Sequence, residues 1–187
     1  MSNAYGNIGI VYHKQGNYQD ALKSELKSLD LDKELGDKIG IGASYVNTGN
    51  IYKDMGNYTE ALDYNQKALS LFDSVGSKYG AGIAYVNIGL IYYLQNKYDE
   101  ALENQLTALG IFRRIDNKNG ISDVYSNIGN IYMDQKKYAL AKKYADSALA
   151  LAKKIGEKDY MRDAYGALYA LDTISGDYKT AYNDYQM

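Results

Sequence analysis

The sequence predicts an all-α fold, an α-solenoid of antiparallel helical hairpins, and three observations support this prediction. The same residue types return every forty positions without insertion or deletion. Within each forty-residue unit, apolar and small residues follow the helical spacing i, i+3, i+4 and i+7. No proline interrupts the chain. A fixed period of this length indicates a hairpin that stacks on copies of itself, because one unit cannot bury its apolar face alone.

Three series of residues define the repeat. They are Tyr5, Tyr45, Tyr85, Tyr125 and Tyr165; Tyr18, Tyr58, Tyr98, Tyr138 and Tyr178; and Ala21, Ala61, Ala101, Ala141 and Ala181. We therefore expect a single array over residues 1–187. Its repeats are expected at about 1–36, 37–76, 77–116, 117–156 and 157–187, the last one truncated.

The second repeat shows the first helix of a hairpin, over about residues 39–55. Tyr45, Thr48, Gly49 and Tyr52 share one face of this helix, because they follow the spacing i, i+3, i+4 and i+7. Gly56 suits the left-handed residue that follows a helix C-terminus.

The second helix of the same repeat begins after Asn57. This asparagine, with Glu60 three residues later, predicts an N-cap and its capping-box partner. The apolar spacing continues to about residue 75, where Gly76 and Ser77 end the helix. The residues that keep the spacing are Tyr58, Ala61, Leu62, Ala68, Leu69 and Phe72.

Each of the first four repeats carries a glycine inside its first helix and an alanine in its second. The glycines are Gly9, Gly49, Gly89 and Gly129. A glycine inside a helix costs about 1 kcal/mol relative to alanine, so four in register indicate a steric requirement. We predict that the two backbones of a hairpin approach closely here. Fourteen of the 22 tyrosines fall in three repeat series, and they are expected mainly in the core and in the seams between helices. The third of these series is Tyr12, Tyr52, Tyr92 and Tyr132.

The segment from Tyr85 to Tyr92, followed by Tyr98–Leu102 and Ala108–Leu109, resembles the tetratricopeptide repeat. Tyrosine replaces the usual tryptophan, and the closing proline is missing. The aromatic residue expected midway along the second helix is also missing; this position holds Glu25, Asn65, Gln105 and Ala145 in turn. The forty-residue unit is similar to that of kinesin light chains, Leu-Gly-Asn-repeat scaffolds and the repeat regions of bacterial sensor histidine kinases.

This resemblance implies a right-handed superhelix whose first helices line a concave groove. It also implies a module that binds a protein or peptide in that groove. An alternative stays open, in which the array is the sensory or regulatory region of a bacterial signalling protein, a histidine kinase or cyclase. Such a region acts through contacts or self-association, and the apolar ends of the array are expected to favour a homo-oligomer.

Composition argues against several other classes of protein. The formal net charge is -2, with no basic region suited to nucleic acid. No apolar run reaches the roughly 18 residues of a membrane span, so membrane insertion is not expected. The chain has no cysteine, which leaves the compartment open: cytoplasmic, or periplasmic if a targeting segment has been removed.

Catalysis has little support in the sequence. His13 is the only histidine, and we interpret it as a solvated residue near a helix end. The glycines are spaced by helix packing and do not form a phosphate-binding loop. We therefore expect no enzymatic activity, no cofactor and no metal site.

A series of asparagines at Asn7, Asn47, Asn87 and Asn127 points toward the groove that the resemblance implies. An amide offers both a donor and an acceptor, so it can hold a peptide backbone of any sequence. The alternative is that these amides bond the neighbouring helix and secure the seam. In the third repeat, Leu90 and Tyr93 make the same face apolar and predict an anchor site. The predicted groove residues are Asn47, Asn50, Asn87, Leu90, Tyr93, Asn127, Asn130 and Met133.

Overall fold

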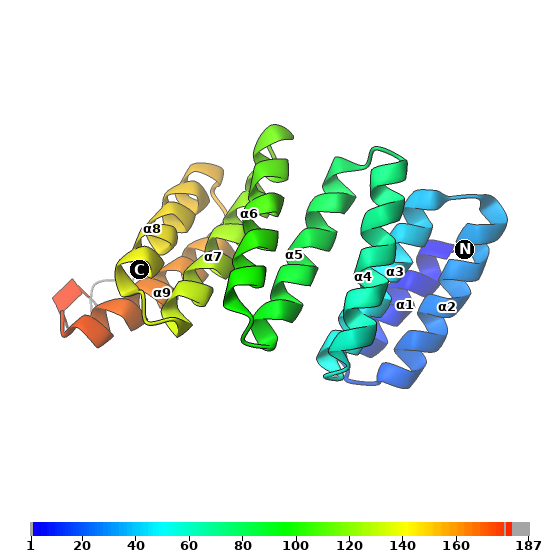
Figure 1. Ribbon diagram of the computed structural model, residues 1–187, viewed down its shortest axis with the longest axis horizontal. Coiled ribbons are helices and arrows are strands. Elements are labelled where there is room, and N and C mark those ends of the chain that lie inside the picture. Colours follow the sequence, from blue (N-terminus) through cyan, green and yellow to red (C-terminus); the bar gives the residue numbers. More distant parts are fainter. Residues whose placement is uncertain (1, 178, 181–187) are drawn as a thin grey trace. The chain divides into compact units, whose positions relative to one another are not determined.

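The computed structural model describes residues 2–177, 179 and 180, and within them the chain forms nine helices and no strand (Figure 1). They are α1 (Ser2–Lys14), α2 (Tyr18–Leu35), α3 (Lys38–Asp54), α4 (Tyr58–Ser74), α5 (Lys78–Leu94), α6 (Tyr98–Arg114), α7 (Lys118–Asp134), α8 (Tyr138–Ile155) and α9 (Lys158–Ser175). The predicted all-α fold of repeated helical hairpins is confirmed. The second helix expected in the last repeat, with Tyr178 and Ala181, falls almost entirely outside the described residues.

The chain divides into two compact units, residues 1–95 and residues 96–187. The first unit holds α1 to α5, and the second holds α6 to α9. In each unit, every helix packs against the next one along the chain, and the first helices of successive hairpins also touch. Thus α1 contacts α3, α3 contacts α5, and α7 contacts α9.

The helix ends follow local chemistry. Gly56 has a φ of 79°, as predicted for the left-handed residue after α3. Asn57 occupies the N-cap position of α4, but its side chain accepts no cap hydrogen bond, so the predicted capping box with Glu60 is wrong. The side chains of Asp37, Ser77 and Asn117 do cap α3, α5 and α7 by accepting backbone N–H groups.

The core of the first unit contains a phenylalanine set between two helical glycines. Phe72 on α4 is 4% exposed. A Cβ atom on Gly42 of α3 or Gly80 of α5 would lie 2.6 or 2.5 Å from the Phe72 ring. The ring therefore occupies the space that side chains at these two positions would need. Phe112 and Gly120 repeat this contact in the second unit, at 2.7 Å.

The repeated tyrosines lie in the seams between helices. Tyr64 of α4 packs against Tyr45 and Tyr52 of α3, with ring centroids 6.0 and 5.5 Å apart. Tyr144 of α8 is placed in the same way against two tyrosines of α7. No described tyrosine of the three repeat series is fully buried, so their expected place in the core is wrong. The seam position is as predicted for Tyr45, Tyr52, Tyr125 and Tyr132, each of which stays partly exposed.

The predicted close approach of the two backbones of a hairpin occurs at Gly49. A Cβ atom on Gly49 would lie 3.2 Å from the Ala61 carbonyl oxygen and 2.3 Å from the Asn65 amide nitrogen. A Cβ atom on Gly9 would meet the Glu25 carboxylate at 2.6 Å. At Gly129 the nearest atom is 3.8 Å away, which is ordinary contact. The steric requirement is therefore absent in the fourth repeat.

This difference predicts opposite effects of one substitution at two equivalent sites. Gly49→Ala should lower the free energy of unfolding by about 1–2 kcal/mol, because the added methyl group has no space. Gly129→Ala should raise it by up to about 1 kcal/mol, because alanine is the better helix former. Urea denaturation of both variants measures the effects. Equal changes at the two sites would contradict this account.

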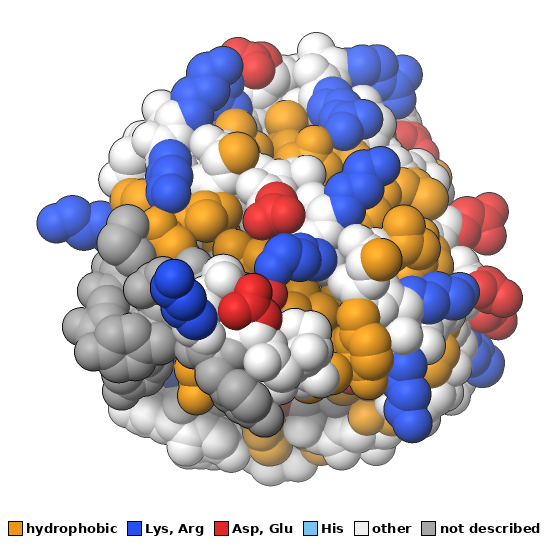
Figure 2. Space-filling view, turned by 90° about the vertical axis from the view of Figure 1, so that its left-hand side faces the viewer, with side chains coloured by type: hydrophobic (Ala, Val, Ile, Leu, Met, Phe, Trp, Pro, Cys, Tyr) orange, Lys and Arg blue, Asp and Glu red, His pale blue; other side chains and the backbone are white. Residues whose placement is uncertain are grey.

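The face of the molecule drawn in Figure 2 is chemically mixed. Figure 2 shows hydrophobic side chains in patches between Lys and Arg side chains, with a few Asp and Glu side chains among them. In the described part of the chain, no helix is long and apolar enough to cross a bilayer. The same residues contain no cluster of side chains suited to a metal ion.

Candidate functional site

One side-chain contact recurs where successive hairpins meet. It joins the residue midway along a second helix to the residue 22 positions later, on the next first helix. The Asn47 amide donates to Glu25 Oε1 over 3.1 Å, and the Asn127 amide donates to Gln105 Oε1 over 3.4 Å. We call each such couple a seam pair. In these two seam pairs, the amide N–H of the predicted groove asparagine serves helix packing.

The seam pair Asn65–Asn87 lacks this hydrogen bond. Asn65 is one methylene shorter than Glu25 or Gln105, and its amide donates to the Ala61 carbonyl at 2.8 Å. Asn65 Oδ1 and Asn87 Nδ2 are both buried without a partner among the described residues. Each unsatisfied buried group costs about 1–3 kcal/mol, so this seam lacks the polar stabilisation of the other two.

The last seam pair, Ala145–Ala167, has no polar side-chain atoms and leaves a space of about 240 Å³ between α7, α8 and α9. We call this space the alanine hollow. It is lined by Tyr125, Ser126, Gly129, Asn130, Met133, Ala141, Ala145, Asp163, Ala167 and Leu171. Ala141, Ala145 and Leu171 belong to a buried apolar cluster and form an apolar floor. Ser126, Asn130 and Asp163 are its polar groups.

A second hollow, of about 230 Å³, lies between α1 and α3 over the seam residue Glu25. We call it the glutamate hollow. It is lined by Gly9, Ile10, His13, Glu25, Asn47, Asn50 and Ile51. Gly9 and Glu25 correspond to Gly129 and Ala145 of the alanine hollow, three repeats later. The two units therefore carry a hollow at the same place in the repeat, with different chemistry at the floor.

The glutamate hollow has a carboxyl group with an unusual acidity. Glu25 is 1% exposed, and this burial raises its pKa to about 7. The hydrogen bond from Asn47 lowers the pKa of Glu25, and the charge of Asp32 raises it, but burial has the largest effect. Glu25 Oε2 and Asn50 Oδ1 are buried and accept no hydrogen bond from the described residues.

His13 lies at the same hollow. Its Nε2 atom is 2.8 Å from Asp54 Oδ2, and its side chain is 21% exposed. His13 lies near the end of α1 as interpreted, but it is half-buried and bonded to Asp54, so it is solvated only in part. Sequence reasoning also gave no role to Glu25 or Ala145. One feature of the sequence could have pointed to these two residues. The position midway along the second helix holds a different residue in each of four repeats.

The structure distributes the predicted groove residues over several environments. Asn47 and Asn50 line the glutamate hollow, and Asn130 and Met133 line the alanine hollow. Those outside both hollows are Asn87, which is buried, and Asn127, Leu90 and Tyr93, which are half-buried. That these eight residues bind a ligand stays a prediction.

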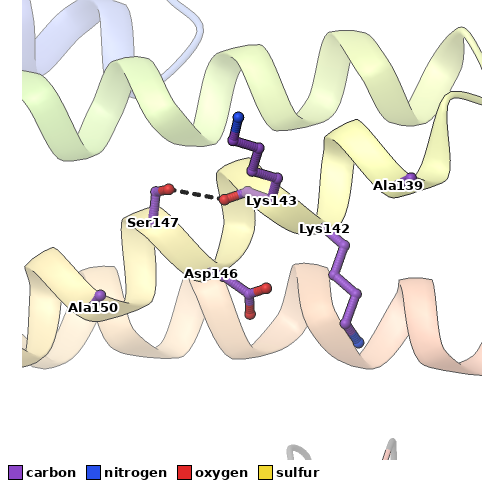
Figure 3. A pocket seen from close by; sticks show the side chains of 6 residues that line it. All are labelled: Ala139, Lys142, Lys143, Asp146, Ser147 and Ala150. Carbon is purple, nitrogen blue, oxygen red and sulfur yellow. Dashed lines mark hydrogen bonds between the residues drawn. The ribbon is translucent and has the colours of Figure 1, made fainter.

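A broader depression of about 620 Å³ lies on α8 alone, lined by Ala139, Lys142, Lys143, Asp146, Ser147 and Ala150 (Figure 3). Lys142 and Lys143 point to opposite sides of the helix. Ser147 Oγ donates to the Lys143 carbonyl at 2.8 Å, and Lys142 forms an ion pair with the buried Asp172 of α9. Ser147 and Lys142 already have partners, and the depression lies on one helix, so it is a weaker candidate than the two hollows.

Several solved structures share this fold. BtubC (BKLC) from P. vanneervenii matches with a TM-score of 0.80 and 20% identity, over 94% of this chain and 73% of that one. A signal transduction ATPase with numerous domains and a tetratricopeptide repeat sensor, from Pyrococcus horikoshii, matches with a TM-score of 0.74 and 28% identity, over 96% of this chain and 28% of that one. A Rap protein complexed with Competence and Sporulation Factor matches with a TM-score of 0.84 and 18% identity, over 97% of this chain and 51% of that one.

The sequence comparisons identify the family. No curated protein matches the chain. The family model of the tetratricopeptide repeat matches three overlapping stretches, residues 1–74, 40–114 and 80–154. These stretches cover most of the chain, and their hairpins are those of the structure. The chain belongs to the tetratricopeptide repeat family.

Proposed function

We propose that the chain binds a protein or peptide ligand through the face of its first helices. The observation that carries this proposal is the pair of hollows at equivalent places in the two units, each between successive first helices. Stacked repeats of this kind serve as protein-interaction modules with extended binding surfaces. A Rap protein of similar fold is known in complex with Competence and Sporulation Factor, which supports a ligand-binding role for this fold.

The alanine hollow is suited to an apolar side chain of the ligand. Its volume of about 240 Å³ is below the roughly 300–1,000 Å³ that holds a drug-sized molecule, so one or two side chains fill it. Burying an apolar side chain contributes about 1.5–3 kcal/mol. Asn130 and Ser126, at the polar part of the hollow, offer donors and acceptors to the ligand backbone.

Filling the alanine hollow tests this proposal. Peptides are selected from a displayed random library and titrated against the Ala145→Gln variant. This substitution gives the fourth repeat the glutamine that the third repeat has at the same position, Gln105. We expect at least about tenfold weaker binding, because the glutamine side chain occupies the space of the apolar anchor. Ala150→Gln, an exposed site on the same helix, is the control. The proposal fails if no peptide is selected, or if Ala145→Gln binds as the unmodified chain does.

Two asparagines of the same helix separate binding from packing. Asn127→Ala should lower the free energy of unfolding by about 1 kcal/mol, because it removes the hydrogen bond to Gln105. Asn130→Ala should leave stability unchanged or slightly raised and weaken peptide binding, because Asn130 is exposed and lines the hollow. Denaturation and titration of the selected peptides measure both. The reverse pattern would place Asn127 in the binding face.

A second candidate function is the sensory region of a signalling protein. The likeness to the Pyrococcus horikoshii ATPase favours it, because that protein carries a tetratricopeptide repeat sensor and shares 28% identity with this chain. Ligand binding at the hollows is then the sensed event. A coding sequence that continues into an ATPase, kinase or cyclase domain, with an activity that a selected peptide changes, would support this candidate.

A further inference from the structure

The glutamate hollow holds two buried hydrogen-bond acceptors that lack a donor. Glu25 Oε2 belongs to a side chain that is 1% exposed, and Asn50 Oδ1 comes from the adjacent helix α3. No described residue donates to either atom. Leaving buried acceptors unsatisfied is unfavourable, and more so when one of them is a carboxylate. The hollow is therefore built to receive hydrogen-bond donors.

The charges around the hollow favour a cation. Asp32 of α2 adds negative potential at Glu25. At the other side, Asp54 of α3 lies 2.8 Å from His13 Nε2 and 3.4 Å from Lys53 Nζ, so it offsets the charge of Lys53. While Glu25 is ionised, an anion or a carbonyl group in the hollow would face only acceptors at Glu25 Oε2 and Asn50 Oδ1. Water donates two hydrogen bonds but leaves the carboxylate charge without compensation.

The arrangement of the acceptors favours a guanidinium group over an ammonium group. The two oxygens belong to residues of different helices, α2 and α3, that line the same hollow, and a planar group with five N–H donors offers hydrogen bonds in two directions at once. An ammonium group offers its donors from a single point. Ile10 and Ile51 also line the hollow and can cover the apolar stem of a long side chain.

We propose that the glutamate hollow is a specificity pocket for an arginine side chain of the bound peptide, held by Glu25 Oε2 and Asn50 Oδ1. This inference rests on the proposed function, and it names the residue type that the first unit selects. The alanine hollow lacks this selectivity, because Ala145 and Ala167 replace the charged seam pair.

The test uses N-acetyl-arginine amide as the probe and N-acetyl-citrulline amide as its neutral isostere. We expect saturable NMR shifts of the Asn47 and Asn50 side-chain amides with the arginine probe, and at least about tenfold weaker binding of the citrulline probe. The pKa of Glu25, followed by carbon NMR of its carboxyl group, should fall below its value of about 7 when the probe is bound. N-acetyl-lysine amide should bind more weakly than the arginine probe.

Glu25→Gln is the decisive variant, because Gln105 makes the same seam hydrogen bond and the fold should be kept. It should weaken the arginine probe by at least about tenfold, while Glu103→Gln, the same change at an exposed site of α6, should have no effect. Equal binding to Glu25→Gln, or no saturable shift with the arginine probe, overturns the inference. If the lysine probe binds as tightly as the arginine probe, the proposed preference for a guanidinium group over an ammonium group is overturned.

The outcomes also separate this inference from the proposed function. Peptides that lack arginine but bind through the alanine hollow should bind Glu25→Gln as they bind the unmodified chain. If such peptides exist and the arginine probe does not bind, the inference fails and the proposed function stands. If the arginine probe binds and no library peptide is selected, the proposed function fails, and the hollow is a site for free guanidinium compounds.

Discussion

Replacing Phe72 by alanine is expected to lower the free energy of unfolding by about 3–5 kcal/mol. The ring is 4% exposed and packs from α4 against two other helices, because it fills the space beside Gly42 of α3 and Gly80 of α5. These glycines cannot offer side chains to close the resulting cavity. The loss should therefore lie in the upper part of the range for an aromatic deletion.

The two glycines make this prediction sharper. In the unmodified chain, Gly80→Ala should be destabilising by about 1–3 kcal/mol, because its methyl group would lie 2.5 Å from the Phe72 ring. In a Phe72→Ala background the same substitution should become neutral or stabilising, because the space is free and alanine favours the helix. A double-mutant cycle measured by urea denaturation gives this change of sign. Additive effects of the two substitutions would refute the packing described for Phe72.

The hairpin architecture was predictable because its signals are local. Helical spacing and turn glycines fix a first helix at about residues 39–55, and the structure has α3 at Lys38–Asp54. The forty-residue period then carries this assignment to the other repeats. The contact of Phe72 with Gly42 and Gly80 was not predicted, because it depends on the mutual rotation of three helices, which no short-range pattern reports.

The candidate site was less predictable for a related reason. Whether the hydrogen bond of a seam pair forms depends on the length of one side chain. Gln105, which is one methylene longer than Asn65, reaches Asn127, whereas Asn65 does not reach Asn87. The alanine hollow requires two small residues, Ala145 and Ala167, to face one another from different helices. The asparagine series was visible in the sequence, but the residue that each amide bonds was not.

Glu25 is expected to make the stability of the chain depend on pH. The pKa of Glu25 is about 7 in the folded chain, against an ordinary value of 4.5. Between these values the unfolded chain releases the proton and the folded chain keeps it, so the free energy of unfolding should fall as the pH rises. The fall should begin near pH 4.5, end just above pH 7, and amount to about 3 kcal/mol. The side chain is 1% exposed, so solvent does little to reduce this effect.

The difference between the unmodified chain and Glu25→Gln isolates this effect from those of the other titratable groups of the chain. Glutamine resembles the protonated glutamic acid, so the two proteins should have similar stability near pH 4.5. Near pH 8, Glu25→Gln should be more stable by on the order of 2–3 kcal/mol, because it avoids an uncompensated buried carboxylate. Urea denaturation at a series of pH values gives the two curves. Parallel curves across this range would show that Glu25 ionises in the folded chain as it does in the unfolded one, and that its burial in the seam carries no electrostatic cost.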